Sequence, residues 1–131
     1  IVPFARVPLV SLTALPITAG CLGAVSSNTP DPDKAVQLEN DWNRSVEVDL
    51  RVVREATDET VYEATHTLDP SAEREVYDVS DADPDGIESF RIVASALNAT
   101  ERTTISTNAC YGDVYVRVDA DGTLAVFHSI C

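Results

Sequence analysis

Strict alternation of apolar and polar residues is the feature that most constrains what this chain can fold into. In residues 45–53, SVEVDLRVV, the apolar residues from Val46 to Val52 point to one side of an extended chain, and charged residues point to the other. This period of two does not suit a helix, whose apolar stripe repeats about every 3.6 residues. The pattern predicts a half-buried strand of an antiparallel sheet.

Further segments favour strands, with short polar turns between them. They are residues 35–40, 60–66, 74–79, 89–97, 102–108, 113–118 and 123–130. Residues 113–118 and 123–130 alternate in the same way, residues 89–97 are apolar on both faces as a central sandwich strand can be, and the remaining segments are weaker. The turns are rich in Asp, Asn, Pro and Gly, and Asp121-Gly122 is a strong hairpin signal. We expect an all-β domain, an antiparallel immunoglobulin-like or Greek-key β-sandwich of about seven or eight strands, with a cupredoxin-like sandwich as the alternative.

The first 34 residues have a different character. Residues 1–20 are apolar and carry one charge, and the run from Val7 to Gly20 is shorter than the roughly 20 residues of a membrane-spanning helix. Such a run after a positive residue is typical of a secretory signal peptide. Residues 24–34, AVSSNTPDPDK, indicate a solvated tether. The expected organisation is a signal peptide over 1–20, an anchor and tether over 21–34, and a β-sandwich over 35–131.

At the boundary lies the motif TAGC, residues 18–21, followed by Leu22 and Gly23. It resembles the lipobox of prokaryotic lipoproteins, and in particular the haloarchaeal form, in which small residues precede a lipid-bearing cysteine. The resemblance implies that Cys21 becomes the mature N-terminus and carries lipid on its sulfur. The alternative is a buried structural cysteine in an N-terminal strand.

The charge balance limits the possible partners. Asp and Glu outnumber Lys and Arg 22 to 9, and the net charge is −13. Such a surface repels phosphate backbones, so we expect no binding of nucleic acid. Like charges destabilise the compact state in dilute buffer and are screened at molar salt, where the Debye length is about 3 Å. The acidic, lysine-poor composition resembles proteins of extremely halophilic archaea, and the alternative is an acidic protein from a GC-rich genome.

The cysteines that follow Cys21 flank a predicted hairpin. Cys110 and Cys131 are expected to form a disulfide, and the alternative is two free thiols. Closing a loop of about 20 residues would contribute roughly 3 kcal/mol to stability.

Candidate ligand groups are few. The segment DADPDG places Asp81, Asp83 and Asp85 at alternate positions before a glycine, like the first half of a calcium loop. The second half departs from that pattern, because Ile92 stands where glutamate is expected, and Glu88 could substitute only with different geometry. A solvated turn is the alternative to a calcium site.

The remaining motifs do not indicate catalysis. His66 and His128 do not complete a blue-copper set, because the chain has no methionine and the cysteines are expected to pair. Neither a G-x-S-x-G nor an H-E-x-x-H motif occurs, so we do not expect an enzyme. Asn43 and Asn98 begin glycosylation sequons in predicted turns. Trp42 is expected to cap the sandwich edge, with an exposed contact for a sugar or protein as the alternative.

Together these features favour a lipid-anchored extracytoplasmic module, structural or interacting, on the surface of a halophilic archaeon. The segments VQLEN, LDPSAEREVYDV and TNACYGDVYVRVDADGTLAVFHSIC are similar to small uncharacterised haloarchaeal lipoproteins, a likeness that implies no activity. The expected partners are the membrane, through lipid on Cys21, and a surface protein or solute. No cofactor is expected unless the aspartate loop binds calcium. The alternative functions are a solute- or cation-binding accessory protein and a redox protein.

Overall fold

The computed structural model describes residues 28–131, and nearly all of the regular structure in this part of the chain is strand. A short 3-10 helix, η2 (Val79–Ala82), interrupts the succession of strands. The strands are β1 (Ala35–Asn40), β2 (Val46–Arg54), β3 (Glu59–Leu68), β4 (Glu73–Asp78), β5 (Ser89–Ala96), β6 (Ala99–Ser106), β7 (Tyr111–Val118) and β8 (Leu124–Ile130). Across residues 28–131, no helix has the length and apolar character needed to span a membrane.

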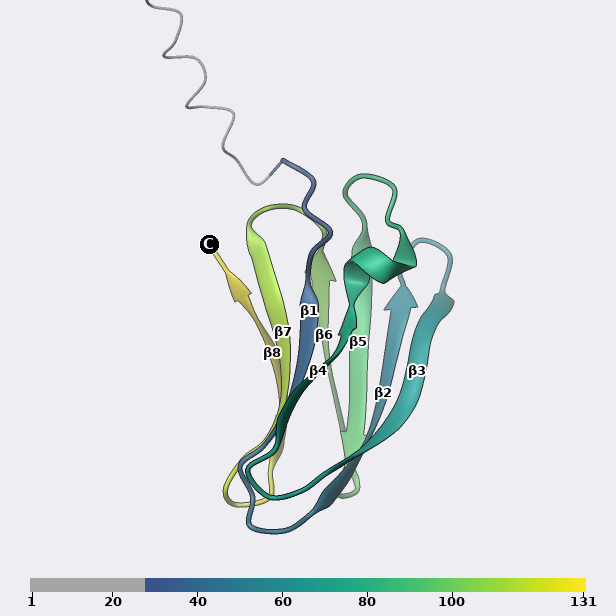
Figure 1. The fold of residues 1–131 in the computed structure, drawn as a ribbon. Coiled ribbons are helices and arrows are strands. Elements are labelled where there is room, and N and C mark those ends of the chain that lie inside the picture. Colours follow the sequence, from purple (N-terminus) through teal and green to yellow (C-terminus); the bar gives the residue numbers. More distant parts are fainter. Residues whose placement is uncertain (1–27) are drawn as a thin grey trace, which may run out of the picture.

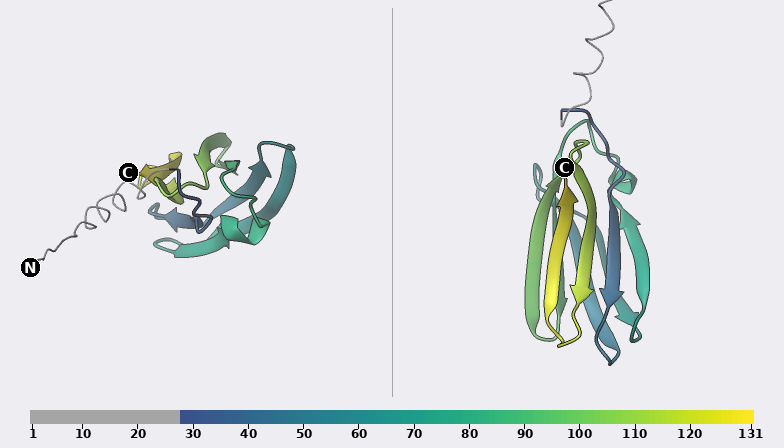
Figure 2. Two further views of the ribbon diagram at one scale, coloured as in Figure 1. Left: turned by 90° about the horizontal axis from the view of Figure 1, so that it is seen from above. Right: turned by 90° about the vertical axis from the view of Figure 1, so that its left-hand side faces the viewer.

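The strands form two four-stranded sheets that pack face to face (Figure 1). One sheet has the order β4-β1-β7-β8, and the other has the order β3-β2-β5-β6. Hairpins join β2 to β3, β5 to β6 and β7 to β8, while every other connection between strands crosses from one sheet to the other. The segment that precedes β1 and the C-terminus lie at the same end of the sandwich (Figure 2).

The predicted β-sandwich is therefore confirmed, with a strand in each segment where alternation predicts one. β6 begins at Ala99, three residues before the expected start at residue 102, because Leu97 and Asn98 alone form the preceding turn. Both turn residues have positive φ, 53° and 65°. Positive φ at both central residues characterises the two-residue type I′ hairpin, whose twist matches that of the flanking strands.

β1 lies inside its sheet and departs from the expected antiparallel pairing on one side. It runs antiparallel to β4 and parallel to β7, where Val36 pairs with Val114 and Leu38 with Val116. In an immunoglobulin constant domain the first, second, fifth and fourth strands share a sheet. Here β1 lies between β4 and β7, so the likeness to immunoglobulin domains is one of architecture rather than of strand order.

The core fills the space between the sheets and follows the alternation in the sequence. In β2 the aliphatic side chains at even positions from Val46 to Val52 are buried, and the charged side chains between them are exposed. The valines of β7 repeat this pattern from Val114 to Val118. Every side chain in the buried apolar cluster lies between Val36 and Leu124. Residues 28–131 therefore contain a hydrophobic core between the two sheets.

A buried lysine closes the end of the sandwich at which the chain enters. The Lys34 side chain is only 1% exposed, and its ammonium lies 3.7 Å from the Asp31 carboxylate. The same ammonium donates hydrogen bonds to the carbonyl oxygens of Asn108 (2.9 Å) and Tyr111 (2.6 Å), which lie in and just after the β6–β7 connection. The sequence pattern places Lys34 in a solvated tether, and this prediction is wrong.

Backbone contacts attach the rest of this leading segment, residues 28–34, to the same connection. The Asp31 N–H donates to the Thr107 carbonyl at 2.7 Å, and the Ala109 N–H donates to the Thr29 carbonyl at 2.8 Å. Pro30 forms an isolated bridge with Asn108. The docked part of the chain thus begins before residue 35, the expected domain boundary.

A buried asparagine closes the opposite end. Asn40, the last residue of β1, has no exposed surface. Its side-chain nitrogen lies within hydrogen-bond distance of the carbonyl oxygens of Arg44 (2.8 Å), Leu68 (3.1 Å) and Asp69 (3.2 Å). Its side-chain oxygen accepts a hydrogen bond from the Trp42 N–H at 3.0 Å. One side chain thereby holds the β1–β2 and β3–β4 connections together.

We expect Asn40→Ala to lower the free energy of unfolding by about 2–3 kcal/mol, because it leaves buried carbonyl oxygens without donors. Asn43→Ala is the matched control, since Asn43 is exposed in the same connection and its loss should change stability by less than about 0.5 kcal/mol. Urea unfolding of residues 28–131 measures both. Equal losses in the two variants would contradict the role assigned to Asn40.

Candidate functional site

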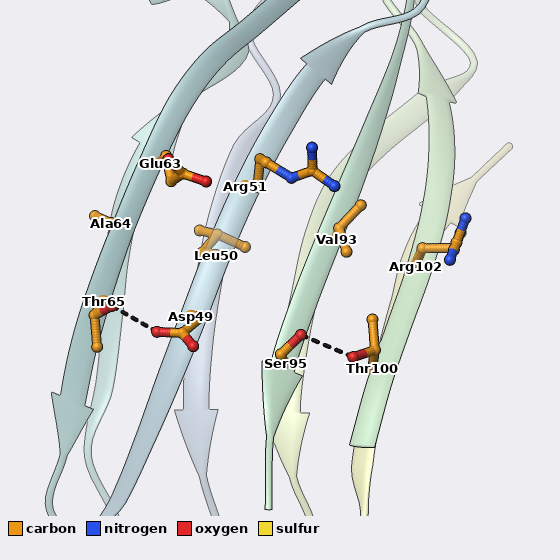
Figure 3. A pocket seen from close by; sticks show the side chains of 10 residues that line it. All are labelled: Asp49, Leu50, Arg51, Glu63, Ala64, Thr65, Val93, Ser95, Thr100 and Arg102. Atoms are coloured by element: carbon orange, nitrogen blue, oxygen red, sulfur yellow. Dashed lines mark hydrogen bonds between the residues drawn. The ribbon is translucent and has the colours of Figure 1, made fainter. Parts of the chain in front are cut away.

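A shallow groove on the outer face of the β3-β2-β5-β6 sheet is a candidate site (Figure 3). Two adjoining hollows, of about 610 and 560 Å³, make up this outer groove and share Asp49, Ser95 and Thr100. The groove extends from the middle of the sheet to the β5–β6 turn at Leu97 and Asn98. Its walls are the solvent-facing side chains that alternate with the core residues.

Strand register arranges these side chains in rows that run across the sheet. The hydroxyl row, in order from β3 to β6, consists of Thr65, Asp49, Ser95 and Thr100. The arginine row, two residues away along each strand, consists of Glu63, Arg51, Val93 and Arg102. Because side chains two residues apart share a face, the two rows lie side by side about 7 Å apart.

Hydrogen bonds connect the members of the hydroxyl row in pairs. The Thr65 hydroxyl donates to one carboxylate oxygen of Asp49 at 2.5 Å, and the hydroxyls of Ser95 and Thr100 lie 2.9 Å apart. The second carboxylate oxygen of Asp49 has no partner within residues 28–131. The row therefore offers free acceptor positions to a ligand that carries hydroxyl groups.

The arginine row contains two guanidinium groups without partners. Figure 3 shows the Arg51 side chain leaning over β5 toward Val93, with Arg102 on β6 beyond it. Neither guanidinium makes an ion pair or hydrogen bond with any residue of the described chain. By contrast, Arg54, Arg91 and Arg117 each approach two carboxylates within 4 Å.

Alternation along β2 shows from sequence alone that Arg51 faces outward. It does not show that Arg102 lies on the same face two strands away, because this depends on the pairing of β2 with β5 and of β5 with β6. The arginine row was therefore missed, and only a correct strand order could have revealed it.

The aspartate loop proposed as a calcium site is organised instead by an arginine. The Arg54 guanidinium donates to the Glu88 carboxylate at 2.6 Å and to the Ala82 carbonyl at 2.5 Å. The same Glu88 oxygen accepts a hydrogen bond from the Asp85 N–H at 2.6 Å. These two hydrogen bonds, that of Arg54 foremost, hold the pKa of Glu88 below its usual value. Glu88, the suggested substitute ligand, is thus already engaged.

The three aspartates do not converge as their alternate spacing predicts. Among residues 28–131 no group of three His, Cys, Asp or Glu side chains is arranged to hold a metal ion. Asp81 lies within η2, and Asp83 caps that helix with a left-handed φ of 53°. A 3-10 turn has about three residues per turn, so alternate side chains point in different directions.

The two histidines lie at different edges of the sandwich. On β3, the His66 ring nitrogen Nε2 lies 2.8 Å from the Tyr62 hydroxyl, and Tyr62 stacks on Tyr77 of β4. Burial lowers the pKa of His66 and raises that of Tyr62. On β8, the His128 Nδ1 lies 2.8 Å from the Thr103 hydroxyl of β6. Each histidine thus belongs to a contact network at an edge where strands of the two sheets meet.

The remaining predicted site residues have the following positions. Cys110 and Cys131 form a disulfide with their Cα atoms 4.9 Å apart, while Cys21 lies outside the described residues. Asn43 and Asn98 are exposed in connections at the end of the sandwich opposite the leading segment. Trp42 packs partly buried against the core, as expected for a cap.

No known protein family matches the chain, and no curated protein matches it. Among solved structures, the NMR structure of a protein from Eubacterium rectale is 16% identical and covers 74% of this chain and 88% of that one, with a TM-score of 0.38. A likeness this weak carries no conclusion about the function of this chain.

The lowered pKa of Glu88 predicts acid-sensitive stability. Ionised Glu88 stabilises the fold above its unfolded-state pKa, near 4.5, and this contribution is lost as the pH falls through the lower folded-state pKa. The difference in unfolding free energy between wild type and Glu88→Gln should therefore be largest near neutral pH and shrink below about pH 4.5.

Denaturant unfolding across this pH range provides the measurement. Glu63→Gln serves as the control, because the Glu63 carboxylate is exposed and has no ion-pair partner within the described residues. Its difference from wild type should stay near zero at every pH. A difference for Glu88→Gln that is unchanged at low pH would argue against the Arg54–Glu88 pair as its source.

Proposed function

We propose that this chain is a lipid-anchored, extracytoplasmic interaction module on the surface of a halophilic archaeal cell. In this proposal Cys21 carries the lipid and the β-sandwich presents a binding surface outside the membrane. The surface used for binding is the outer groove of the β3-β2-β5-β6 sheet. The chain acts by holding a partner at the cell surface rather than by catalysis.

One observation carries this proposal. At the end where the chain enters the sandwich, both the leading segment and the C-terminus are attached to the β6–β7 connection. Lys34 and the leading segment bind the β6–β7 connection, and the Cys110–Cys131 disulfide ties the C-terminus to that connection as well. Both ends of the described chain are thus attached to one short loop. A force applied through the N-terminal side is spread over several attachments and does not peel away a terminal strand.

The position of β1 supports the same function. β1 follows the leading segment directly and is hydrogen-bonded on both sides, to β4 and to β7. To pull β1 along its axis, a force must shear two ladders of hydrogen bonds together. The outer groove lies on the other sheet, away from this attachment, and stays accessible when the entry end faces the membrane.

Replacing the anchor residue tests the location. We expect wild-type protein to sediment with membranes and Cys21→Ser protein to be released or to remain unprocessed. Cell fractionation followed by mass spectrometry of the N-terminus measures both outcomes. Cys110→Ser is the matched control, since it also replaces a cysteine by serine but leaves Cys21 in place, and so should leave the membrane fraction unchanged. Identical processing and sedimentation of wild type and Cys21→Ser would refute the lipid anchor.

The halophilic part of the proposal predicts a dependence of stability on salt. We expect residues 28–131 to unfold at a higher temperature in molar KCl than in dilute buffer, because salt screens repulsion among carboxylates. A variant with Glu73, Glu75 and Glu101 changed to glutamine should show a weaker dependence, since these side chains are exposed and have no ion-pair partner within the described chain. Equal melting temperatures at both salt concentrations would contradict the halophilic origin.

A further inference from the structure

We infer that the outer groove binds an acidic saccharide, whose carboxylate or sulfate groups are held by Arg51 and Arg102. This inference rests on the proposed function, because it names the ligand of the surface that the anchored module presents. The ligand class follows from the arginine row, the hydroxyl row and the shape of the groove.

Charge complementarity is the first argument. Carboxylates are abundant on this chain, with 22 Asp and Glu against 9 Lys and Arg, yet Arg51 and Arg102 remain unpaired within residues 28–131. Glu63 pairs with Arg51 in the strand register, but the Arg51 side chain leans the other way, over Val93 (Figure 3). A guanidinium group offers parallel donors that match the two oxygens of a carboxylate or sulfate. The two arginines are therefore suited to an anionic group from outside the chain. Glu47, Asp49 and Glu63 also line the hollows and disfavour a ligand that is anionic along its whole length.

The hydroxyl row distinguishes a saccharide from other polyanions. Beside the arginine row lie hydroxyls that both donate and accept, and the Asp49 carboxylate, which only accepts. A sugar hydroxyl can donate to the free oxygen of Asp49, whereas a second anionic group would be repelled by it. The groove thus favours a chain whose charges are separated by hydroxyl groups. An acidic polypeptide, with a charge on every residue and no hydroxyls, fits this arrangement less well.

The shape and lining of the groove favour an oligosaccharide as the ligand rather than a single sugar. The two hollows join at Asp49, Ser95 and Thr100 and extend to the β5–β6 turn, so several sugar units can lie along the strands. No aromatic ring lines either hollow. Neutral sugars, which often need a stacking surface, therefore gain little here, and recognition depends on the charged and hydroxyl groups.

The inference is tested by titration calorimetry in molar KCl on residues 28–131, which contain both sheets and the core between them. The acidic probes are an oligogalacturonate, which carries carboxylates, and a chondroitin sulfate oligosaccharide, which carries sulfates as well. Maltohexaose is the neutral probe, and polyglutamate is the acidic polypeptide. We expect one or both acidic saccharides to bind and the other two probes not to bind. Binding of chondroitin sulfate alone would identify sulfate as the group recognised.

Variants then assign the binding to the arginine row. Arg51→Gln and Arg102→Gln should each weaken binding about tenfold, as expected for loss of a charge-assisted hydrogen bond. Arg117→Gln is the matched control, because it removes the same charge from the outer face of the other sheet. Its affinity should equal that of wild type. Thermal melting of each variant verifies folding, and NMR shift mapping of wild type should place the changes on β2, β5 and β6.

Several outcomes would overturn the inference. They are no binding of either acidic saccharide, equal binding of polyglutamate, affinity unchanged in both groove variants, and an equal loss in Arg117→Gln. A dimer that forms at high concentration and is lost in the groove variants would assign the groove to a second copy of this chain. All of these measurements use protein without Cys21, so their failure is distinct from a failure of the anchor test.

Discussion

Two buried polar side chains, at the two ends of β1, determine how this sandwich closes. Lys34 precedes the strand and Asn40 ends it, and both point at backbone carbonyl oxygens of connections that cross between the sheets. A buried carbonyl without a donor destabilises a fold by about 1–3 kcal/mol. The side chains at the two ends of β1 donate to carbonyl oxygens in or beside these connections, in addition to the backbone hydrogen bonds that the connections make. β1 thereby sets the position of its neighbours in the sheet and of the loops at both ends.

The sequence was sufficient for the strands and the core but not for their arrangement. Alternation identifies the buried valines of β2 and β7, since one buried face imposes a period of two. Strand order depends on pairings between distant segments, which no local pattern records. Lys34 was misplaced because lysine is almost never fully buried. The turn at Leu97 was misplaced because a leucine rarely adopts positive φ.

The same distinction between local pattern and strand arrangement applies to the candidate sites. The aspartate loop was visible as a motif, yet Asp81 lies in the 3-10 turn of η2 and Asp83 in its left-handed cap, and the carboxylates are not brought together. The outer groove was invisible as a motif, because its residues come from four strands and only their register brings them together. A local cluster of like charges is therefore visible in the sequence, whereas a site of mixed chemistry that is distributed over four strands is not.

Some outward-facing arginines of the sandwich have carboxylate partners and others have none, and this contrast is the strongest physical guide to the binding surface. On the β4-β1-β7-β8 face, Arg117 pairs with Glu39 and Asp41 and lies over the Phe127 ring. Its charge is neutralised within the fold. On the other face, Arg91 pairs with Glu55 and Asp58 near one end of β5. Arg51 and Arg102 flank Val93 on the same face without such partners. An acidic chain has no shortage of carboxylates for these arginines, so the free donors of Arg51 and Arg102 mark the part of this face that is available to an anion from outside.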